Sequence, residues 1–167
     1  MTDEGGVGGV RKLPQNARTL PDAETQDFPC SGCVGPAFLR IDSITVQPGR
    51  IVCEVTVDPV RRTTDPALAS ALLREHPTLL SHACVNDVGD TFGDVIERTS
   101  VPHLLEHLVI DLQARTDGRP DDTFVGTTEW IDEGEGRAVV QVSFTDDLVC
   151  LRAFRDAAEK INDAMLR

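Results

Sequence analysis

Two pairs of β-rich segments, each pair joined by a short turn, restrict this chain to a small set of folds. The four segments cover residues 38–46, 50–57, 123–131 and 137–144. Pro48-Gly49 separates the first two, and residues 132–136, which include two glycines, separate the last two. Strand-forming runs that flank turns this short are typical of antiparallel hairpins. The sequence therefore predicts two hairpins.

Helical segments occupy the stretch between the hairpins and the stretch after the second one. They are expected over residues 67–74, 91–97, 101–114 and from about 147 to 166. Asp65 and Ser100 are suited to cap two of them, and Asp146 or Asp147 the last, because short polar side chains bind the free N–H groups of a first turn. Residues 79–84 are apolar but remain unassigned. This order predicts a single compact α+β domain, with helices packed on one face of an antiparallel sheet.

Residues 1–29 differ in composition from the rest of the chain. They contain the run GGVGG and three prolines, with few large apolar side chains. Such a segment buries too little surface to offset the entropy lost on ordering. We therefore predict a flexible tail over residues 1–29 and a folded domain over residues 30–167.

The chain carries 28 acidic and 16 basic residues, a formal net charge of −12. This balance argues against a nucleic-acid partner, since such proteins need lysines and arginines to bind phosphates, and it favours a cationic partner. No apolar run approaches the roughly 18 residues of a membrane span, and the N-terminus lacks the regions of a secretory signal. We expect a cytoplasmic protein without a membrane partner, whose five cysteines are reduced thiols.

The segment His103-Leu-Leu-Glu106-His107 is an H-x-x-E-H pattern inside a predicted helix. At about 100° per residue, both imidazoles and the Glu106 carboxylate share one face, and the large aliphatic residues occupy the other. Two imidazoles one turn apart can chelate one ion, and a nearby glutamate can take a proton from zinc-activated water. This inverted zinc-peptidase motif predicts His103 and His107 as metal ligands and Glu106 as general base. The competing interpretation is a solvated polar face that carries two histidines.

A catalytic zinc site needs a third protein ligand from elsewhere in the chain. Cys84, as a thiolate, is the first choice and His82 the second, because both lie in a segment that can fold back beside the helix. Glu159 in the last helix and Glu129 in the third strand are weaker candidates. Each of the four has a competing interpretation as a structural or simply exposed residue.

The other cysteines have different predicted roles. Cys53 and Cys150 fall among apolar residues and are assigned to the core. Cys30 and Cys33 form a lone C-x-x-C pair, which cannot by itself close a tetrahedral zinc site. The βαβ context of a thioredoxin-like redox motif is also missing.

Acidic residues cluster late in the chain. Residues 121–147 contain eight of them, with Arg137 as the single base. One interpretation is a solvated rim on the second hairpin. The other is a patch that attracts an arginine-rich substrate towards the metal.

The order of these motifs resembles the N-terminal domain of cyanophycin synthetases. In that domain an H-x-C element precedes a Phe-rich helix, an H-x-x-E-H helix that ends in Leu-Gln, and a strand that begins Phe-Gly. The matching segments here are His82-x-Cys84, residues 92–97, residues 103–113 and Phe124-Val-Gly126. The resemblance covers roughly residues 38–166.

The resemblance implies a fold and an activity. Some of these domains are metal-dependent hydrolases that cut cyanophycin, a polyaspartate with arginine side branches, into primers, and others mainly hold the substrate. It implies His103 and His107 as ligands and Glu106 as base, and it matches Cys84 to the family's cysteine. This chain departs at Thr127-Thr128-Glu129, where the family has an arginine-containing stretch. Both ATP-dependent ligase domains are missing, so we expect a stand-alone protein that does not synthesise the polymer.

The leading hypothesis is a zinc hydrolase of amide bonds in a peptide or a cyanophycin-like polymer. The main alternative is a non-catalytic binding module of the same fold, which recognises a polymer or a protein partner through its acidic residues. A sulfur-ligated metal site with a purely structural role is the third possibility. Metal donors exposed beside a groove would favour hydrolysis.

Overall fold

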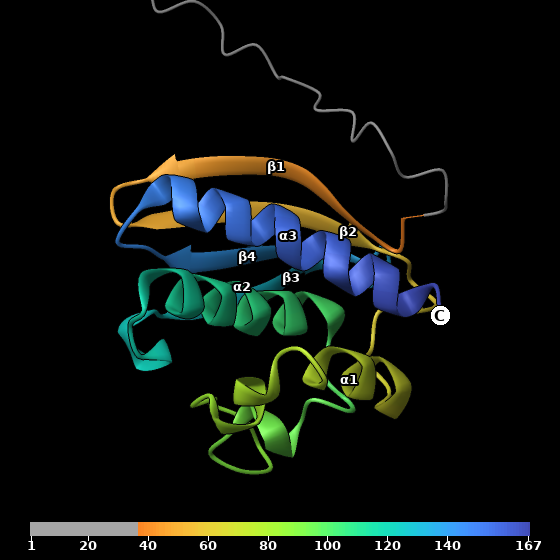
Figure 1. Ribbon diagram of the computed structural model, residues 1–167. Helices are drawn as coiled ribbons and strands as arrows, with labels where there is room; N and C mark the ends of the chain where they lie inside the picture. Colours follow the sequence, from red (N-terminus) through yellow and green to blue (C-terminus); the bar gives the residue numbers. More distant parts are fainter. Residues whose placement is uncertain (1–36) are drawn as a thin grey trace, which may run out of the picture. The chain divides into compact units, whose positions relative to one another are not determined.

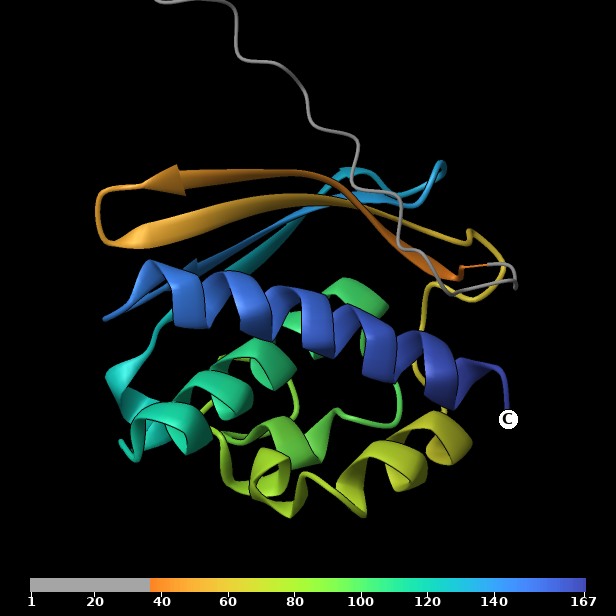
Figure 2. The same cartoon turned by 45° about the horizontal axis from the view of Figure 1, so that its top comes forward.

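A four-stranded antiparallel sheet, with helices on one of its faces, forms the domain in this computed structural model, which describes residues 37–167 (Figures 1 and 2). The strands are β1 (Leu39–Gln47), β2 (Arg50–Val57), β3 (Gly126–Asp132) and β4 (Arg137–Ser143), in the spatial order β1-β2-β4-β3. The helices are α1 (Pro66–Leu73), α2 (Val101–Asp117) and α3 (Asp147–Met165). The predicted α+β class is confirmed. The predicted tail and the Cys30 and Cys33 pair lie outside the described residues.

Both predicted hairpins are confirmed, and they join through their second strands. β2 pairs with β1 and also with β4, which in turn pairs with β3. Gly136 helps to align the two hairpins, because its carbonyl accepts a hydrogen bond from the N–H of Val57 at 2.8 Å. A Cβ at this glycine would lie 2.0 Å from the Val57 carbonyl oxygen, and its φ of +72° is left-handed, so only glycine fits.

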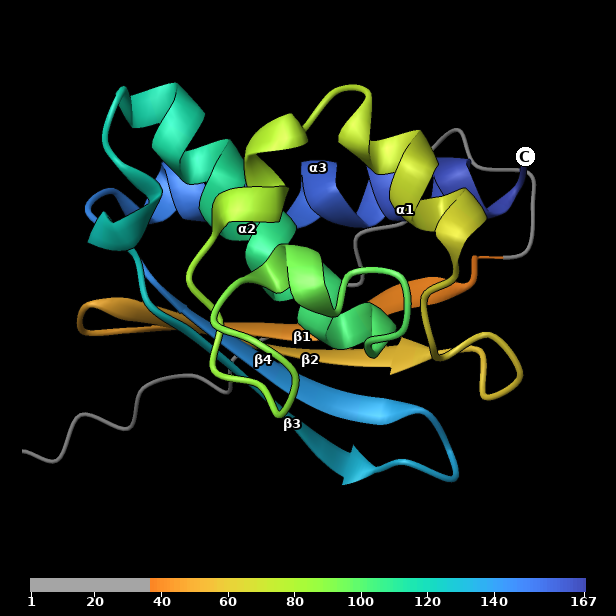
Figure 3. The ribbon, with the colours of Figure 1, turned by 90° about the horizontal axis from the view of Figure 1, so that it is seen from below.

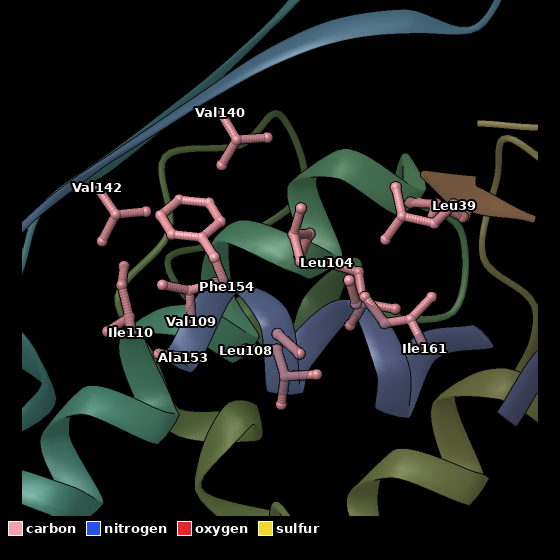
Figure 4. Close-up of a cluster of buried hydrophobic side chains, with 14 of the residues drawn as sticks. Leu39, Leu104, Leu108, Val109, Ile110, Val140, Val142, Ala153, Phe154 and Ile161 are labelled. Atoms are coloured by element: carbon pink, nitrogen blue, oxygen red, sulfur yellow. The ribbon is translucent and has the colours of Figure 1, made fainter. Parts of the chain in front are cut away.

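The core lies between the sheet and the helices. Alternate residues of β2 and β4 point towards the helices and are buried, as expected for strands with one covered face. Phe154 and Ile161 of α3 pack here with Leu104 and Leu108 of α2 (Figure 4). Cys53 and Cys150 are fully buried free thiols, which confirms their assignment to the core.

Local capping signals explain the helix starts. Asp65 accepts a hydrogen bond from the N–H of Leu68, and Asp146 caps α3. Ser100 caps α2 by accepting from the N–H of His103 at 3.3 Å. α2 continues three residues beyond the expected end at Ala114, because no helix-breaking residue precedes Gly118, which takes a left-handed φ of +63°.

The segment between α1 and α2 is less regular than predicted. Helix 91–97 is reduced to one 3-10 turn, η2 (Phe92–Asp94), and the unassigned stretch contains another, η1 (Pro77–Ser81). A third turn, η3 (Asp121–Thr123), delays the start of β3 by three residues relative to the prediction. The segment from η1 to η2 lies against α2 (Figure 3). No helix within residues 37–167 combines the length and apolar content needed to cross a bilayer.

Candidate metal centre

One face of α2 presents the side chains of the H-x-x-E-H motif. His103 and His107 lie one turn apart, and their Nε2 atoms are 3.2 Å from each other. His107 and Glu106 are buried, whereas His103 is half-buried. The motif is therefore not on the fully solvated face that the competing interpretation required. Its side chains meet in the interior, at the edge of a cavity.

Cys84 completes a group of three donor atoms. Its Sγ lies 3.5 Å from His103 Nε2, and one ligand atom each from Cys84, His103 and His107 all lie within 4.8 Å of one another. The loop that carries the thiol is held by its backbone: the N–H of Cys84 donates to the carbonyl of Asp90, and that of Phe92 donates to the carbonyl of His82. The segment thus folds back beside α2, and this group could hold a metal ion.

The imidazoles are prepared to act as neutral ligands. Burial lowers the pKa of His107 to about 3, with the neighbouring His103 and His82 as smaller causes, and burial also lowers the pKa of His103. Both rings are therefore uncharged at neutral pH, and each has one nitrogen with a free lone pair. Thr99 Oγ1 lies 2.7 Å from His103 Nδ1. A proton on Nδ1 would be shared with this hydroxyl, leaving the Nε2 lone pair free for an ion.

Phe92 fixes the rings of both histidines. Its ring stacks on His107 with a centroid distance of 4.0 Å and an interplanar angle of 19°. It contacts His103 edge-on at 5.3 Å. Phe92 is itself completely buried, so it forms a rigid wall behind the donor atoms.

The structure places His82 against His107, on the side away from the three donors. Its Nδ1 lies 3.4 Å from His107 Nδ1, while its Nε2 faces the carboxylates of Asp121 at 3.4 Å and Asp111 at 3.8 Å. An imidazole in this place can accept the Nδ1 proton of His107, while its buried Nε2 faces the two carboxylates without a hydrogen bond to either. Such outer contacts orient a metal-binding histidine.

The two weaker candidates lie on different elements, and only one of them borders the cavity. Glu129 lines the cavity from β3, with an exposed side chain. Glu159 is exposed on α3 and is not among the residues that line this cavity.

Glu106 is held by β3. The Thr128 hydroxyl donates to Glu106 Oε2 at 2.5 Å. Burial raises the pKa of Glu106, and the hydrogen bond from Thr128 partly opposes this shift. A Cβ on Gly126 would lie 2.6 Å from Glu106 Oε1, so the close approach of β3 to the carboxylate depends on glycine. Thr128 was missed as a site residue, because its strand pattern gave no sign of a partner on α2.

A buried polar network extends the site along α2. Asp111 follows His107 by one further turn, accepts a hydrogen bond from the Thr78 hydroxyl, and lies 2.6 Å from His76 Nδ1. Burial alone would raise the pKa of Asp111, but hydrogen bonds from His76 and Thr78 outweigh it and lower the pKa. Sequence reasoning missed this group, although Asp111 repeats the four-residue spacing of His103 and His107.

An open cavity of about 670 Å³ lies between α2, the Cys84 loop and β3. The metal-binding group and Glu106 are on one side, and β3 is on the other. Of the late acidic cluster, Asp121 brings its carboxylate to this cavity, whereas the side chain of Glu129 is exposed on the other face of β3, and Glu133 and Glu135 form surface ion pairs. No lysine or arginine within residues 37–167 lines it. The cavity is therefore suited to a cationic ligand.

Comparison with known proteins agrees with this architecture. The family model described as cyanophycin synthase-like N-terminal domain matches residues 52–166. Searches of curated proteins and of solved structures gave no match. The family match runs from β2 through the Cys84 loop, α2 and β3 to the end of α3, and so includes every residue of the metal centre. The chain belongs to the family of cyanophycin synthase-like N-terminal domains.

Proposed function

We propose that this protein is a metal-dependent hydrolase of amide bonds, with zinc held by Cys84, His103 and His107. The observation that carries the proposal is the position of Glu106. Its carboxylate lines the same cavity as the three donor atoms and is held there by Thr128. A structural metal site needs no such carboxylate beside it.

The spacing of the donor atoms fits zinc. Around a tetrahedral zinc ion, two imidazole nitrogens lie about 3.3 Å apart, and a nitrogen and a thiolate sulfur about 3.6 Å, from bond lengths of about 2.05 and 2.3 Å. The corresponding separations here are 3.2 Å between the histidines and 3.5 Å between Cys84 and His103. One sulfur and two nitrogens suit zinc, and three protein ligands are the number typical of catalytic sites. When bound, zinc supplies a Lewis acid that activates water and polarises a carbonyl.

Glu106 acts as the general base in this proposal. Its buried environment raises its pKa, which makes the carboxylate a better proton acceptor near neutral pH. The Thr128 hydroxyl occupies Oε2, so Oε1 is the oxygen left to accept the proton of the attacking water. The same oxygen then donates that proton to the departing amine.

The charge of the site favours an arginine-containing substrate. The acidic side chains at the cavity are those of Glu106 and Asp121, and the chain has a net charge of −12. Such a field raises the local concentration of cations. The family name points to cyanophycin, and we propose an arginine-rich peptide or a cyanophycin-like polymer as the substrate.

Metal analysis and a base variant test this function. Protein purified without chelators is expected to contain one zinc ion per chain and to release fragments from cyanophycin or an arginine-rich peptide. Glu106→Gln should keep the metal and lose at least about 100-fold in rate, within the range of general-base contributions. Glu159→Gln, which removes the same charge from α3, serves as the control and should keep full activity.

Two results would contradict the proposal. If the purified protein contained no stoichiometric metal, the proposed metal centre would be ruled out. If Glu106→Gln were as active as the wild-type protein, Glu106 could not be the general base. A metal-loaded protein that binds the polymer without cutting it would instead establish the binding module.

A further inference from the structure

β3 has an open edge beside the metal centre. In the sheet order β1-β2-β4-β3, only one side of β3 is paired with another strand of the described domain. An edge strand leaves every second pair of its N–H and C=O groups without a partner in the sheet. The free groups of β3 matter more than those of β1, because β3 borders the cavity that holds the donor atoms.

The hydrogen-bond pattern identifies which residues carry the free groups. The N–H of Ser143 donates to the carbonyl of Val125 at 2.8 Å, so these two form a hydrogen-bonded pair. Hydrogen-bonded and non-hydrogen-bonded pairs alternate along an antiparallel ladder. The residues whose backbone groups point towards β4 are therefore Thr127 and Glu129. The residues whose backbone groups point away from β4 are Gly126, Thr128 and Trp130.

These outward groups face the cavity. Gly126, Thr128 and Trp130 all line it, and no backbone hydrogen bond outside the sheet uses their N–H or C=O groups within residues 37–167. The Thr128 side chain meanwhile holds Glu106. The free edge of β3 thus passes directly beside the carboxylate that we assign as general base.

We propose that β3 binds its substrate as an added β-strand: an extended cationic peptide pairs with the backbone of Gly126, Thr128 and Trp130. Main-chain pairing supplies affinity independent of side chains, and the carboxylate of Asp121, which lies beside His82 at the cavity, selects for positive charge. The inference rests on the proposed function in that it uses the same cavity, and it explains how a peptide bond is brought alongside Glu106.

N-methylation of a peptide tests the pairing, because it removes backbone donors without changing the side chains. The probes are two hexa-arginine peptides with three N-methyl groups each. Methylation at alternate residues leaves one edge of the extended peptide intact, whereas methylation of peptide residues 3 to 5 removes at least one donor from each edge. Because the peptide is a homopolymer, a shift of register cannot hide the difference.

Binding is measured by fluorescence anisotropy on the full chain with Glu106→Gln, so that no cleavage occurs. The alternately methylated peptide should bind like unmethylated hexa-arginine. The consecutively methylated one should bind about fivefold more weakly, since even its less affected edge loses one hydrogen bond of about 1 kcal/mol. Equal affinities of the two methylated peptides would overturn the proposal, and so would a failure of unmethylated hexa-arginine to bind.

Hydrogen exchange gives a second measurement on the protein itself. Hexa-arginine should slow amide exchange in β3 and leave β1, the other edge strand, unchanged. Asp121→Asn should weaken binding several-fold in low salt, whereas Glu159→Gln should not. Equal protection of both edges would contradict the proposal.

The outcomes separate this inference from the hydrolase proposal. If the protein discriminates between the methylated peptides but cleaves no peptide, the strand-pairing proposal is supported and the hydrolase proposal is contradicted. If the protein cleaves peptides and binds both methylated probes equally, the hydrolase proposal is supported and the strand-pairing proposal is contradicted.

Discussion

The two sides of α2 are both buried, but among different kinds of atoms. On one side Leu104 and Leu108 pack against the sheet and α3 with no exposed surface. On the other side His107 and Asp111 are only 3% and 2% exposed, yet each contacts polar side chains. Apolar contacts are non-directional, whereas buried polar groups each need a placed partner. We therefore expect changes on the apolar side to alter stability, and changes on the polar side to alter metal binding and catalysis.

The largest expected effect lies on the apolar side. Phe154→Ala removes a fully buried ring and should lower the free energy of unfolding by about 3–5 kcal/mol. Urea denaturation measures this loss. Zinc affinity of the folded fraction should stay within about twofold, because Phe154 contacts the side of α2 opposite the donors. A large loss of zinc affinity would show that the apolar side of α2 also controls metal binding, contrary to this expectation.

The apolar core also contains two buried thiols, which should make the stability of the protein depend on pH. Burial raises the pKa of both Cys53 and Cys150 from 9.0 to about 12. Above pH 9 the unfolded state releases these protons and the folded state does not, so stability falls as the pH rises. At pH 10 the expected loss is about 1.4 kcal/mol per thiol.

Urea denaturation at pH 7, 9 and 10 checks this loss. A variant with both Cys53→Ala and Cys150→Ala should show a smaller drop between pH 7 and 10 than the wild-type protein. An identical drop in both proteins would assign the pH effect to other groups.

On the polar side, Asp111→Asn should weaken zinc binding by about 10- to 100-fold, as for other outer contacts of metal ligands. The change removes the charge that faces His82, which in turn contacts His107. Competition with a chelator measures the affinity. Asp117→Asn, on the same helix and hydrogen-bonded to Thr145, is the control and should leave the affinity unchanged. Equal losses in both variants would point to a general weakening of α2.

The smallest expected effect comes from Thr128→Val, which removes one hydroxyl and keeps the shape. The hydrogen bond from Thr128 lowers the pKa of Glu106, so its loss should raise that pKa and move the acid limb of the rate profile to higher pH. Stability should change by about 1 kcal/mol or less. A pH–rate profile of kcat/KM measures the shift. An unmoved acid limb would show that Thr128 does not tune the base.

Local signals were sufficient for most of the fold. The Pro48-Gly49 turn, the caps at Asp65 and Ser100 and the alternation in β2 act over a few residues, so they can be recognised in a single sequence. The predicted boundaries of elements were wrong where tertiary contacts determine them. Residues 92–94 form one 3-10 turn instead of a helix, because Phe92 is inserted against His103 and His107.

The site divides in the same way. The helical spacing by itself determined that His103, Glu106 and His107 share one face, since 3.6 residues per turn is a property of the helix alone. Only the tertiary structure decided that Cys84 lies at this face, that Thr128 holds Glu106 and that Asp111 is buried with His76. Those contacts join residues about 20 to 35 positions apart, and their geometry follows from how whole elements pack, which no local pattern encodes.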